Sequence, residues 1–444
     1  MQTAFRDDQL ADPDIAESNK ILRSCVHCGF CTATCPTYVL LGDELDSPRG
    51  RIYLIKDMLE NDRPATTEVV KHIDRCLSCL ACMTTCPSGV NYMHLVDHAR
   101  AHIERTYRRP LLERVLRASL AKVMPSPRLF RMSLWAALLA KPLAPLFSAL
   151  NLKPVTAMLR LAPGKIPRHH LHGARTFPAV GARRARVALL SGCVAPVLSP
   201  AINEAAIRVL VRNGIEVVHA EGEGCCGSLV HHMGRKDAAL AQARANIDAW
   251  TREIEGQGLD AIVITASGCG TTVKDYGYLF RTDRRYAAKA AKISALARDI
   301  SEYVTGLNLA LQPGAAPMVV AYHGACSLQH GQKIAREPKE LLGKVGFVVK
   351  DVPEGHLCCG SAGVYNILQS DIARRLRDRK IFNIERTAPD IIAAGNIGCI
   401  VQIASGTETA VVHPIELIDW ATGGPLPPAM ARQGGVIARR HGMN

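Results

Sequence analysis

The sequence predicts an α+β, multi-domain protein: an α-helical N-terminal domain, a basic helical linker and a duplicated α/β domain. The 444 residues include 16 cysteines, eight of which form two copies of one spacing in the first hundred residues. The other eight follow apolar runs at repeated positions in the second half. The stretch between these parts contains the whole of the net charge of +14. A chain of this length can form two or three domains, each with its own core.

The N-terminal cysteines occur in two runs of C-x2-C-x2-C-x3-C-P, which is the spacing of two-cluster bacterial ferredoxins. In that arrangement the fourth cysteine of each run binds the cluster of the other run. We therefore expect two [4Fe–4S] clusters, the first bound by Cys25, Cys28, Cys31 and Cys86, the second by Cys76, Cys79, Cys82 and Cys35. Zinc is the alternative, but zinc sites take their cysteines in two pairs, which fits these runs poorly.

The segments between and after these runs are predicted to be helical. Ser47 and Pro48 form a helix start, and apolar residues follow on one face of the predicted helix. A second helix is expected through Val69 to Ile73, and a third from about Met93 to Tyr107. The insertion of 40 residues between Cys35 and Cys76 makes residues 1–105 resemble the helical ferredoxin domain of succinate dehydrogenase and fumarate reductase iron–sulfur subunits.

Residues 106–185 form the basic linker. Between Arg105 and Arg186 there are 17 Lys and Arg but one acid, Glu113. The apolar pieces Met132–Ala140 and Pro142–Leu152 lie among these charges. Two interpretations stay open: helices packed on the protein with a solvated basic rim, or a segment in the headgroup layer of an anionic membrane. No nucleic-acid partner is expected, because no binding motif or interleaved aromatics accompany the charge. No stretch is expected to reach the roughly 18 apolar residues of a membrane-spanning helix.

Four apolar runs in residues 186–424 are predicted to be buried parallel strands, with helices between them, of which Glu204–Asn213 is the clearest. The strands are Val187–Leu190, Ala261–Thr265, Met318–Tyr322 and Ile391–Ala394. A cysteine follows each strand within a few residues: Cys193, Cys269, Cys326 and Cys399. Ligands of open parallel sheets gather at the carboxyl ends of the strands, so these thiols indicate a site.

This part is an internal repeat, with copies at about 186–312 and 313–424. The gap from Cys193 to Cys225 is 31 residues, and the gap from Cys326 to Cys358 is also 31. Each copy has a Cys-Cys-Gly-Ser run, at Cys225–Ser228 and at Cys358–Ser361. Residues 425–444, which are rich in Pro and Gly, are expected to form a flexible tail.

The Cys, Cys-Cys-Gly, Cys layout resembles the cysteine-rich "CCG" domain of heterodisulfide reductase and related subunits. In that family each copy ends in C-x-x-C, and five thiolates hold an open four-iron cluster. Here the last cysteine is replaced by Thr272 and by Gln402. Two interpretations stay open: a further iron–sulfur cluster in at least one copy, or buried thiols that only pack. The residues concerned are Cys193, Cys225, Cys226, Cys269, Cys326, Cys358, Cys359 and Cys399.

Several histidines lie near these motifs in the sequence, and the residues alone do not separate ligands from satisfied side chains. They are His231, His232, His323 and His356, whereas His169, His170 and His172 are expected to be loop residues. The run from Gly222 to Gly227 matches G-x-G-x-x-G by letter. It lacks the acidic residue about 20 positions later, so we do not interpret it as a dinucleotide site.

Further runs resemble the iron–sulfur subunit of bacterial glycolate oxidase (glycolate dehydrogenase) over nearly the whole chain. They are Leu41–Arg51, Ala266–Thr272 and Leu357–Gly363. One departure lies between His323 and Cys326, where an Asp and a Pro are expected and Gly324 and Ala325 stand instead.

The resemblance implies an electron-transfer subunit of a complex that oxidises glycolate to glyoxylate. The chain has no flavin or nicotinamide motif, so we expect no catalytic residue here and assign the oxidation to FAD-containing partner subunits. The expected acceptor is membrane quinone. The polar start without a signal peptide predicts a cytoplasmic protein, peripheral on the cytoplasmic face of the inner membrane. The alternatives are the same subunit in glycerol-3-phosphate or lactate oxidation, and a heterodisulfide-reductase-like subunit.

Overall fold

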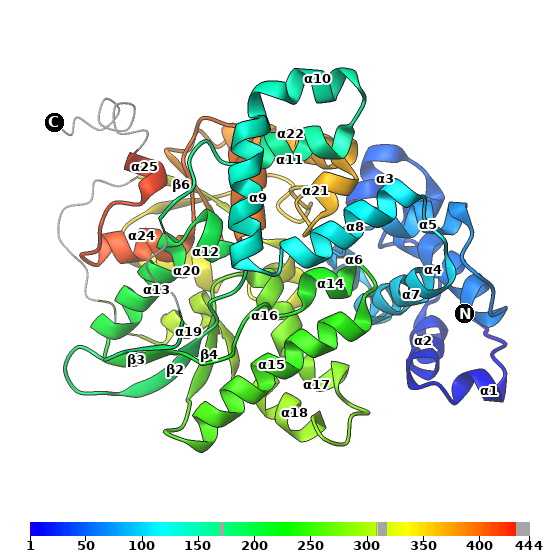
Figure 1. Cartoon of the computed structure of the whole chain (residues 1–444), viewed down its shortest axis with the longest axis horizontal. Helices are drawn as coiled ribbons and strands as arrows, with labels where there is room; N and C mark the ends of the chain where they lie inside the picture. Colours follow the sequence, from blue (N-terminus) through cyan, green and yellow to red (C-terminus); the bar gives the residue numbers. More distant parts are fainter. Residues whose placement is uncertain (169–172, 308, 310–317, 432–444) are drawn as a thin grey trace.

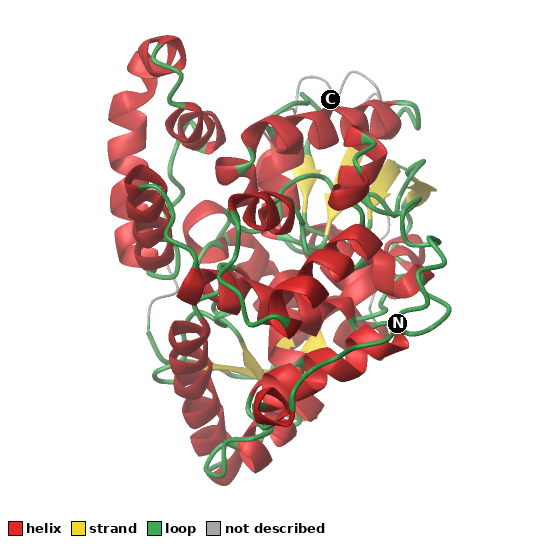
Figure 2. Cartoon of the chain, turned by 90° about the vertical axis from the view of Figure 1, so that its right-hand side faces the viewer, coloured by secondary structure: helices red, strands yellow, loops and turns green. Residues whose placement is uncertain are grey.

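The computed structural model describes residues 1–168, 173–307, 309 and 318–431. The N-terminal helices lie at one side of the molecule, the linker helices run over the top, and two small sheets occupy the other side (Figure 1). The view turned by 90° shows the strands in two separate groups among many helices (Figure 2). The predicted α+β class, with a helical N-terminal part and a duplicated α/β part, is confirmed.

The helical N-terminal part is built on α2 (Pro13–Ser24), α4 (Pro48–Glu60), α5 (Thr67–Asp74) and α7 (Tyr92–Thr106), which bury one cluster of aliphatic side chains. The three predicted helices are α4, α5 and α7. Helix α4 begins as its sequence predicts, because the hydroxyl of Ser47 accepts a hydrogen bond from Gly50 N at 3.0 Å. The short elements are α1 (Asp7–Leu10), α3 (Pro36–Leu41), η1 (Glu44–Asp46) and α6 (Ala81–Thr85).

The first repeat contains a five-stranded sheet of order β1-β3-β2-β4-β5. Only the edge strand β1 (Arg175–Phe177) is antiparallel to its neighbour. The strands β2 (Ala185–Leu189) and β4 (Ala261–Ile264) confirm two predicted runs to within two residues, and they pair in parallel as predicted. The others are β3 (Ile215–His219) and β5 (Ala297–Asp299). Its helices are α12 (Ala195–Leu198), α13 (Ala201–Arg212), α14 (Ser228–His232), α15 (Lys236–Glu255), α16 (Ser267–Lys274), α17 (Tyr276–Leu279), α18 (Ala287–Leu296) and α19 (Ile300–Thr305).

The second repeat contains a parallel sheet of order β7-β6-β8-β9. This order matches β3-β2-β4-β5 of the first repeat, strand for strand. The strands β6 (Val319–His323) and β8 (Ile391–Ala394) confirm the other two predicted runs. The remaining elements are η3 (Ser327–Gly331), α20 (Glu337–Lys344), β7 (Val348–Asp351), α21 (Tyr365–Leu368), α22 (Ser370–Glu385), α23 (Ile397–Ala404), β9 (Val411–Val412), α24 (Pro414–Ala421) and α25 (Pro428–Ala431).

The two repeats share one core. Val187 and Leu189 of β2 lie in the same buried cluster as Val320 and Ile391 of the second sheet. The alternate residues of β2 face the opposite way and pack with Trp250 of α15. Because side chains alternate between the two faces of a strand, one face of β2 packs on its own helices and the other on the second repeat. The repeats therefore form a single packed body.

The linker forms α8 (Leu111–Val123), α9 (Pro127–Ala140), η2 (Lys141–Leu143), α10 (Ala144–Ala149) and α11 (Lys153–Leu161). Its inner side chains are buried, and Leu120 packs with Met233 of the first repeat and Val364 of the second. The outer side chains of α9 are exposed: Trp135 is 58% and Leu139 is 83% exposed. The linker thus combines packed helices with an uncovered apolar face.

The expectation that no stretch is long enough to span a membrane is wrong for the linker. Within the described residues, one continuous helical stretch, Pro127–Ala149, reaches this length and apolarity in its 23 residues. The sequence suggested two pieces because Lys141 and Pro145 interrupt the apolar run. The structure instead continues the helix through a 3-10 turn at Lys141–Leu143, since proline is tolerated in the first turn of a new helical segment.

The region expected to form a tail from residue 425 begins with a packed element. Met430 of α25 is buried in the core that the two repeats share. Residues 432–444, the repeat boundary near 312–313, and His169, His170 and His172 lie outside the described residues.

Candidate metal centres

The first N-terminal cysteine run lines a cavity that also includes a residue of the second run. The cavity is bordered by the predicted ligands of the first cluster, Cys25, Cys28, Cys31 and Cys86, and by Cys82. Two apolar side chains beside it, Val26 and Phe30, are 67% and 64% exposed. This cavity therefore lies at the surface of the protein.

A second cavity lies beside the first and deeper in the protein. It is bordered by the four predicted ligands of the second cluster, Cys35, Cys76, Cys79 and Cys82. Because Cys82 borders both cavities, the two are direct neighbours. Cys35 and Cys86 each lie in the cavity formed mainly by the opposite run, which is the crossing that the sequence predicts. The binding of iron by these thiols remains a prediction.

The backbone conformation of the two runs explains their spacing. His27 and Gly29 have φ of +55° and +86°, and Ser78 and Leu80, at the same positions of the second run, have +48° and +63°. Two left-handed residues on either side of the middle cysteine curl each run around its cavity. Gly29 also has no room for a side chain, because an added Cβ would lie 2.6 Å from Nη1 of Arg49.

The thiols in these cavities have the chemistry of metal ligands rather than of free nucleophiles. Burial raises the pKa of Cys31 to about 11 and the pKa of Cys79 and Cys82 well above the usual value. A cluster holds such groups as thiolates because iron replaces the proton. Four thiols around each cavity are the donor set that a [4Fe–4S] cluster requires, so the residues present fit the predicted cofactor.

A buried charged network stabilises the second cavity, and the sequence analysis missed it. The guanidinium of Arg51 is 1% exposed and hydrogen-bonds Asp46 at 3.2 Å, Thr37 at 2.9 Å and the His72 carbonyl at 2.7 Å. Asp46 also accepts from Arg75 at 2.7 Å. Helical spacing offered a signal, since Arg51 precedes Ile55 by one turn of α4 and so lies on its buried face.

The eight cysteines of the repeats separate into two groups, one at each sheet. In the first repeat, Cys193, Cys225, Cys226 and Cys269 are in mutual contact. Hydrogen bonds from Cys193 and Cys226 lower the pKa of Cys225 to about 4. The neighbouring main chain is fixed by Tyr276, whose hydroxyl donates to the Cys226 carbonyl at 2.8 Å. Four neighbouring thiols of this kind can bind a metal.

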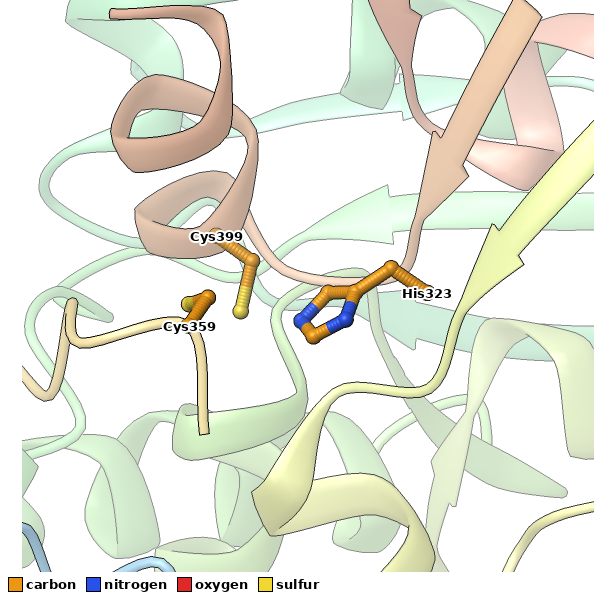
Figure 3. A group of neighbouring side chains, drawn as sticks. All are labelled: His323, Cys359 and Cys399. Carbon is orange, nitrogen blue, oxygen red and sulfur yellow. The ribbon is translucent and has the colours of Figure 1, made fainter. Parts of the chain in front are cut away.

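In the second repeat, Cys326, Cys358, Cys359 and Cys399 contact one another in that order. His323 lies with them: Figure 3 shows its ring pointing toward the sulfurs of Cys359 and Cys399. One ring nitrogen of His323 and these two sulfurs lie within 4.8 Å of one another. Of the histidines that the sequence left open, His323 is the one that the structure brings to a group of thiols in the described residues.

Two of the other histidines have an acidic partner. His231 and His232 pair with Asp97 of α7 at 3.3 and 3.1 Å, which joins the first repeat to the N-terminal helices. Burial opposes ionisation of Asp97, but the two histidines outweigh it and hold its pKa well below the usual value. His356 lies beside His330, whose ring contacts the His356 carbonyl at 3.2 Å.

The glycine of each Cys-Cys-Gly run is required by close packing. Gly227 and Gly360 have φ of +89° and +88°. An added Cβ would lie 2.8 Å from the Ala239 carbonyl oxygen at Gly227 and 2.5 Å from the Ala373 carbonyl oxygen at Gly360. Each glycine thus lets the cysteine pair approach the following helix, α15 or α22.

Two thiols of the second repeat pack with a cysteine that borders the second N-terminal cavity. Cys79 packs in the same buried cluster as Cys326 and Cys358. The contact is reinforced by hydrogen bonds from Tyr365 to the Arg75 carbonyl at 3.0 Å and between Thr84 and His330 at 2.8 Å. This contact was not predicted from the sequence, because the residues that form it are more than 240 positions apart.

Comparison with family models matches the same parts of the chain. Residues 21–90 match the model described as "4Fe-4S dicluster domain". Residues 187–274 and 320–404 both match the model described as "Cysteine-rich domain".

Comparison with known proteins finds full-length relatives. The chain is 44% identical to the "Glycolate oxidase iron-sulfur subunit" of Escherichia coli (strain K12), over 95% of this chain and 99% of that protein. It is 30% identical to the "Probable glycolate oxidase iron-sulfur subunit" of Bacillus subtilis (strain 168), over 90% and 94%. It is 24% identical to "Lactate utilization protein A" of Bacillus cereus (strain B4264), over 53% of this chain and 98% of that protein.

A solved structure shares the fold. The "Crystal structure of a hypothetical protein from Helicobacter pylori" aligns with a TM-score of 0.54 and 9% identity, covering 95% of this chain and 74% of the other.

Proposed function

Because the chain belongs to the family of glycolate oxidase iron–sulfur subunits, we propose that it is the electron-transfer subunit of a complex that oxidises glycolate to glyoxylate. The observation that carries this proposal is the pair of adjacent cavities, each bordered by four predicted cysteine ligands and sharing Cys82. Two [4Fe–4S] clusters bound there would accept and donate single electrons. The partner that oxidises the substrate would be a FAD-containing subunit.

The environments of the two cavities support electron transfer from the partner subunit to the first cluster and from there to the second. The first cavity lies at the surface beside Val26 and Phe30, and the second is surrounded by buried groups. The exposed apolar pair gives a partner subunit a surface to pack against close to the first cluster. Because Cys82 borders both cavities, the second cluster would lie next to the first.

The substrate is tested with the complete complex. Anaerobic addition of glycolate is expected to reduce the clusters within the turnover time, which is followed by electron paramagnetic resonance after freezing. Reduction by glycerol 3-phosphate but not by glycolate would overturn the assignment. Disulfide reduction by the isolated chain would instead favour a heterodisulfide-reductase-like role.

Lactate is the second candidate substrate. Its support is the similarity to "Lactate utilization protein A", which extends over 98% of that protein. Glycolate and lactate are both 2-hydroxy acids, so the same subunit could serve either oxidation. The initial rates of cluster reduction by the two acids at equal concentration separate these candidates.

We propose that the linker holds the complex on the cytoplasmic face of the inner membrane, with quinone as acceptor. Its exposed large apolar side chains, which together we call the linker face, are Leu111, Leu112, Val115, Met132, Trp135, Leu139, Leu143, Leu146 and Leu150. Exposed Arg108, Arg114, Lys122 and Arg128 lie among them. Apolar side chains flanked by cations fit the headgroup layer of an anionic membrane.

Part of the linker charge has a structural role instead. Arg109 and Arg117 are buried and both pair with Asp74, at 2.6 and 2.7 Å. These ion pairs fix α8 to the N-terminal helices. The linker face is therefore held in a defined position relative to the two cavities.

A further inference from the structure

The imidazole of His323 is buried without a hydrogen-bond partner. The residue ends β6 and is 1% exposed. Within the described residues, neither Nδ1 nor Nε2 has a partner. A buried polar group without a partner costs roughly 1–3 kcal/mol, and native proteins rarely leave one so. A neutral imidazole offers a lone pair to a metal ion.

The atoms nearest to this ring are soft metal ligands. A ring nitrogen of His323 and the sulfurs of Cys359 and Cys399 lie within 4.8 Å of one another. The three side chains converge from separate elements, the end of β6, the Cys-Cys-Gly run and the start of α23 (Figure 3). Cys359 and Cys399 are 0% and 5% exposed, so water does not compete for the site.

The spacing of these donors fits one metal ion better than a cluster. Ligands of a tetrahedral zinc ion lie about 2.0–2.3 Å from the metal, which places them roughly 3.5–4 Å from one another. The thiolates of a four-iron cluster bind different iron atoms and lie further apart. Mixed nitrogen and sulfur donors in tetrahedral geometry are typical of zinc.

A buried cation balances the charge that such a site would have. Lys380 is 2% exposed, and its Nζ donates to the Glu354 carbonyl at 2.9 Å. The Glu354 carboxylate pairs with Arg379 instead. Thiolates at Cys326, Cys358 and Cys359 would interact favourably with the Lys380 ammonium. One zinc ion with three thiolates has a charge of −1, which the ammonium offsets.

The first repeat lacks this imidazole. His323 stands three residues before Cys326, and the corresponding residue before Cys193 is Leu190, which packs in an apolar cluster. The two repeats thus have equivalent thiols but differ at this position. A requirement of the fold would be shared by both copies. The imidazole beside the thiols is therefore a property of the second copy.

We propose that the second repeat binds a single zinc ion through His323, Cys359 and Cys399, with Cys358, whose thiol contacts that of Cys359 but lies outside this group of three, as the fourth ligand. Zinc does not change its oxidation state, so this ion would have a structural role. It would fix the Cys-Cys-Gly run and the end of β6 next to Cys79 of the second cavity. The proposal is independent of the substrate of the complex.

The test is the metal content of the anaerobically purified complex. We expect about one zinc per chain in addition to the iron, and loss of that zinc in His323→Leu, which introduces the residue of the first repeat. Cys399→Ser is expected to lose it too, while Cys269→Ser, the matched change in the first repeat, retains it. Replacement of zinc by cobalt should give the intense visible absorption of tetrahedral cobalt with thiolate ligands in the native chain and not in His323→Leu.

Two outcomes would overturn the proposal. If the native complex, purified from cells grown with added zinc, contains zinc only at background level, the site does not bind zinc. A fall in iron and acid-labile sulfide, rather than zinc, in His323→Leu would assign the imidazole to an iron cluster. Loss of all metals in His323→Leu through misfolding is recognised by loss of the N-terminal cluster signal. In that case the zinc contents of Cys399→Ser and Cys269→Ser are compared. Loss of zinc from the first variant alone supports the site, and equal zinc in both overturns it.

Discussion

Nη1 of Arg51 lies 3.7 Å from Sγ of Cys35, inside the buried network that closes the second cavity. The guanidinium is fully charged, and Asp46, Thr37 and the His72 carbonyl hold it in place. A fixed positive charge next to a ligand thiolate favours the reduced, more negative state of a cluster. Among the described residues, the cation that borders the first cavity is Arg49, which is 35% exposed and paired with Glu44.

We therefore expect Arg51→Gln to lower the reduction potential of one cluster by roughly 50–100 mV, because a buried unit charge at this distance contributes a few kcal/mol. The measurement is a redox titration followed by paramagnetic resonance. Arg49→Gln is the matched control and should shift the other cluster much less, since solvent screens it. Equal shifts in the two variants would contradict the role of the buried charge.

The ligand assignment predicts the iron content of cysteine variants. The native chain should contain about 8 iron atoms and 8 acid-labile sulfides in the two N-terminal clusters. Cys28→Ser is expected to reduce the first cluster signal, and Cys79→Ser the second. A native content of about 12 or 16 would mean that thiols of the repeats bind iron as well.

The linker face predicts binding to lipid. Trp135→Glu is expected to weaken binding of the complex to anionic vesicles at least several-fold, because it places a charge in the apolar contact. Phe382→Glu is the matched control, since Phe382 is 63% exposed and lies outside the linker. The measurement is vesicle flotation with and without anionic lipid. Equal flotation of both variants would rule out a role for this face.

The Asp97–His231 pair predicts a pH dependence of stability. The pKa of Asp97 is lowered, so its contribution is present above the unfolded value of about 3.9 and is lost as the pH falls. Burial opposes protonation of His231, but Asp97 outweighs it and raises the pKa. That contribution is complete below about 6.5 and is lost as the pH rises through the raised pKa.

The contact is thus strongest between about pH 4 and 6.5. Asp97→Asn should destabilise the protein by roughly 2–4 kcal/mol at pH 6, since it leaves a buried histidine without its counterion. Hydrogen exchange of α7 and α14 measured at several pH values follows the effect. A variant with the same pH profile as the native chain would argue against this pair.

The conformation of Gly360 predicts a large effect of a small substitution. Gly360→Ala is expected to cost roughly 2–4 kcal/mol, because the new Cβ meets the Ala373 carbonyl in addition to the strain of positive φ. Gly363 also has positive φ, of +65°, but has no atom within 4 Å of an added Cβ. Gly363→Ala should cost only about 1 kcal/mol. Thermal unfolding under anaerobic conditions compares the two.

Much of the local structure could be predicted because its signals are local. The capping residue Ser47 and the apolar spacing after it determine α4. The four apolar runs become β2, β4, β6 and β8 because β-branched and aliphatic residues favour buried strands. The prediction that no stretch of the linker is long enough to span a membrane was wrong, because the apolar run is interrupted at Lys141. Local signals do not show whether a helix continues through a proline in its first turn.

The sequence by itself determined the two cysteine runs and the duplication. It also predicted the pairing of each run with the fourth cysteine of the other, because ligand spacing along a chain restricts the possible geometry of a cluster. Only the tertiary structure decided that Arg51 lies beside Cys35, that Cys79 borders the thiols of the second repeat, and that His323 faces Cys359 and Cys399. These contacts join residues from different elements, and their closeness follows from how the domains pack rather than from any local pattern.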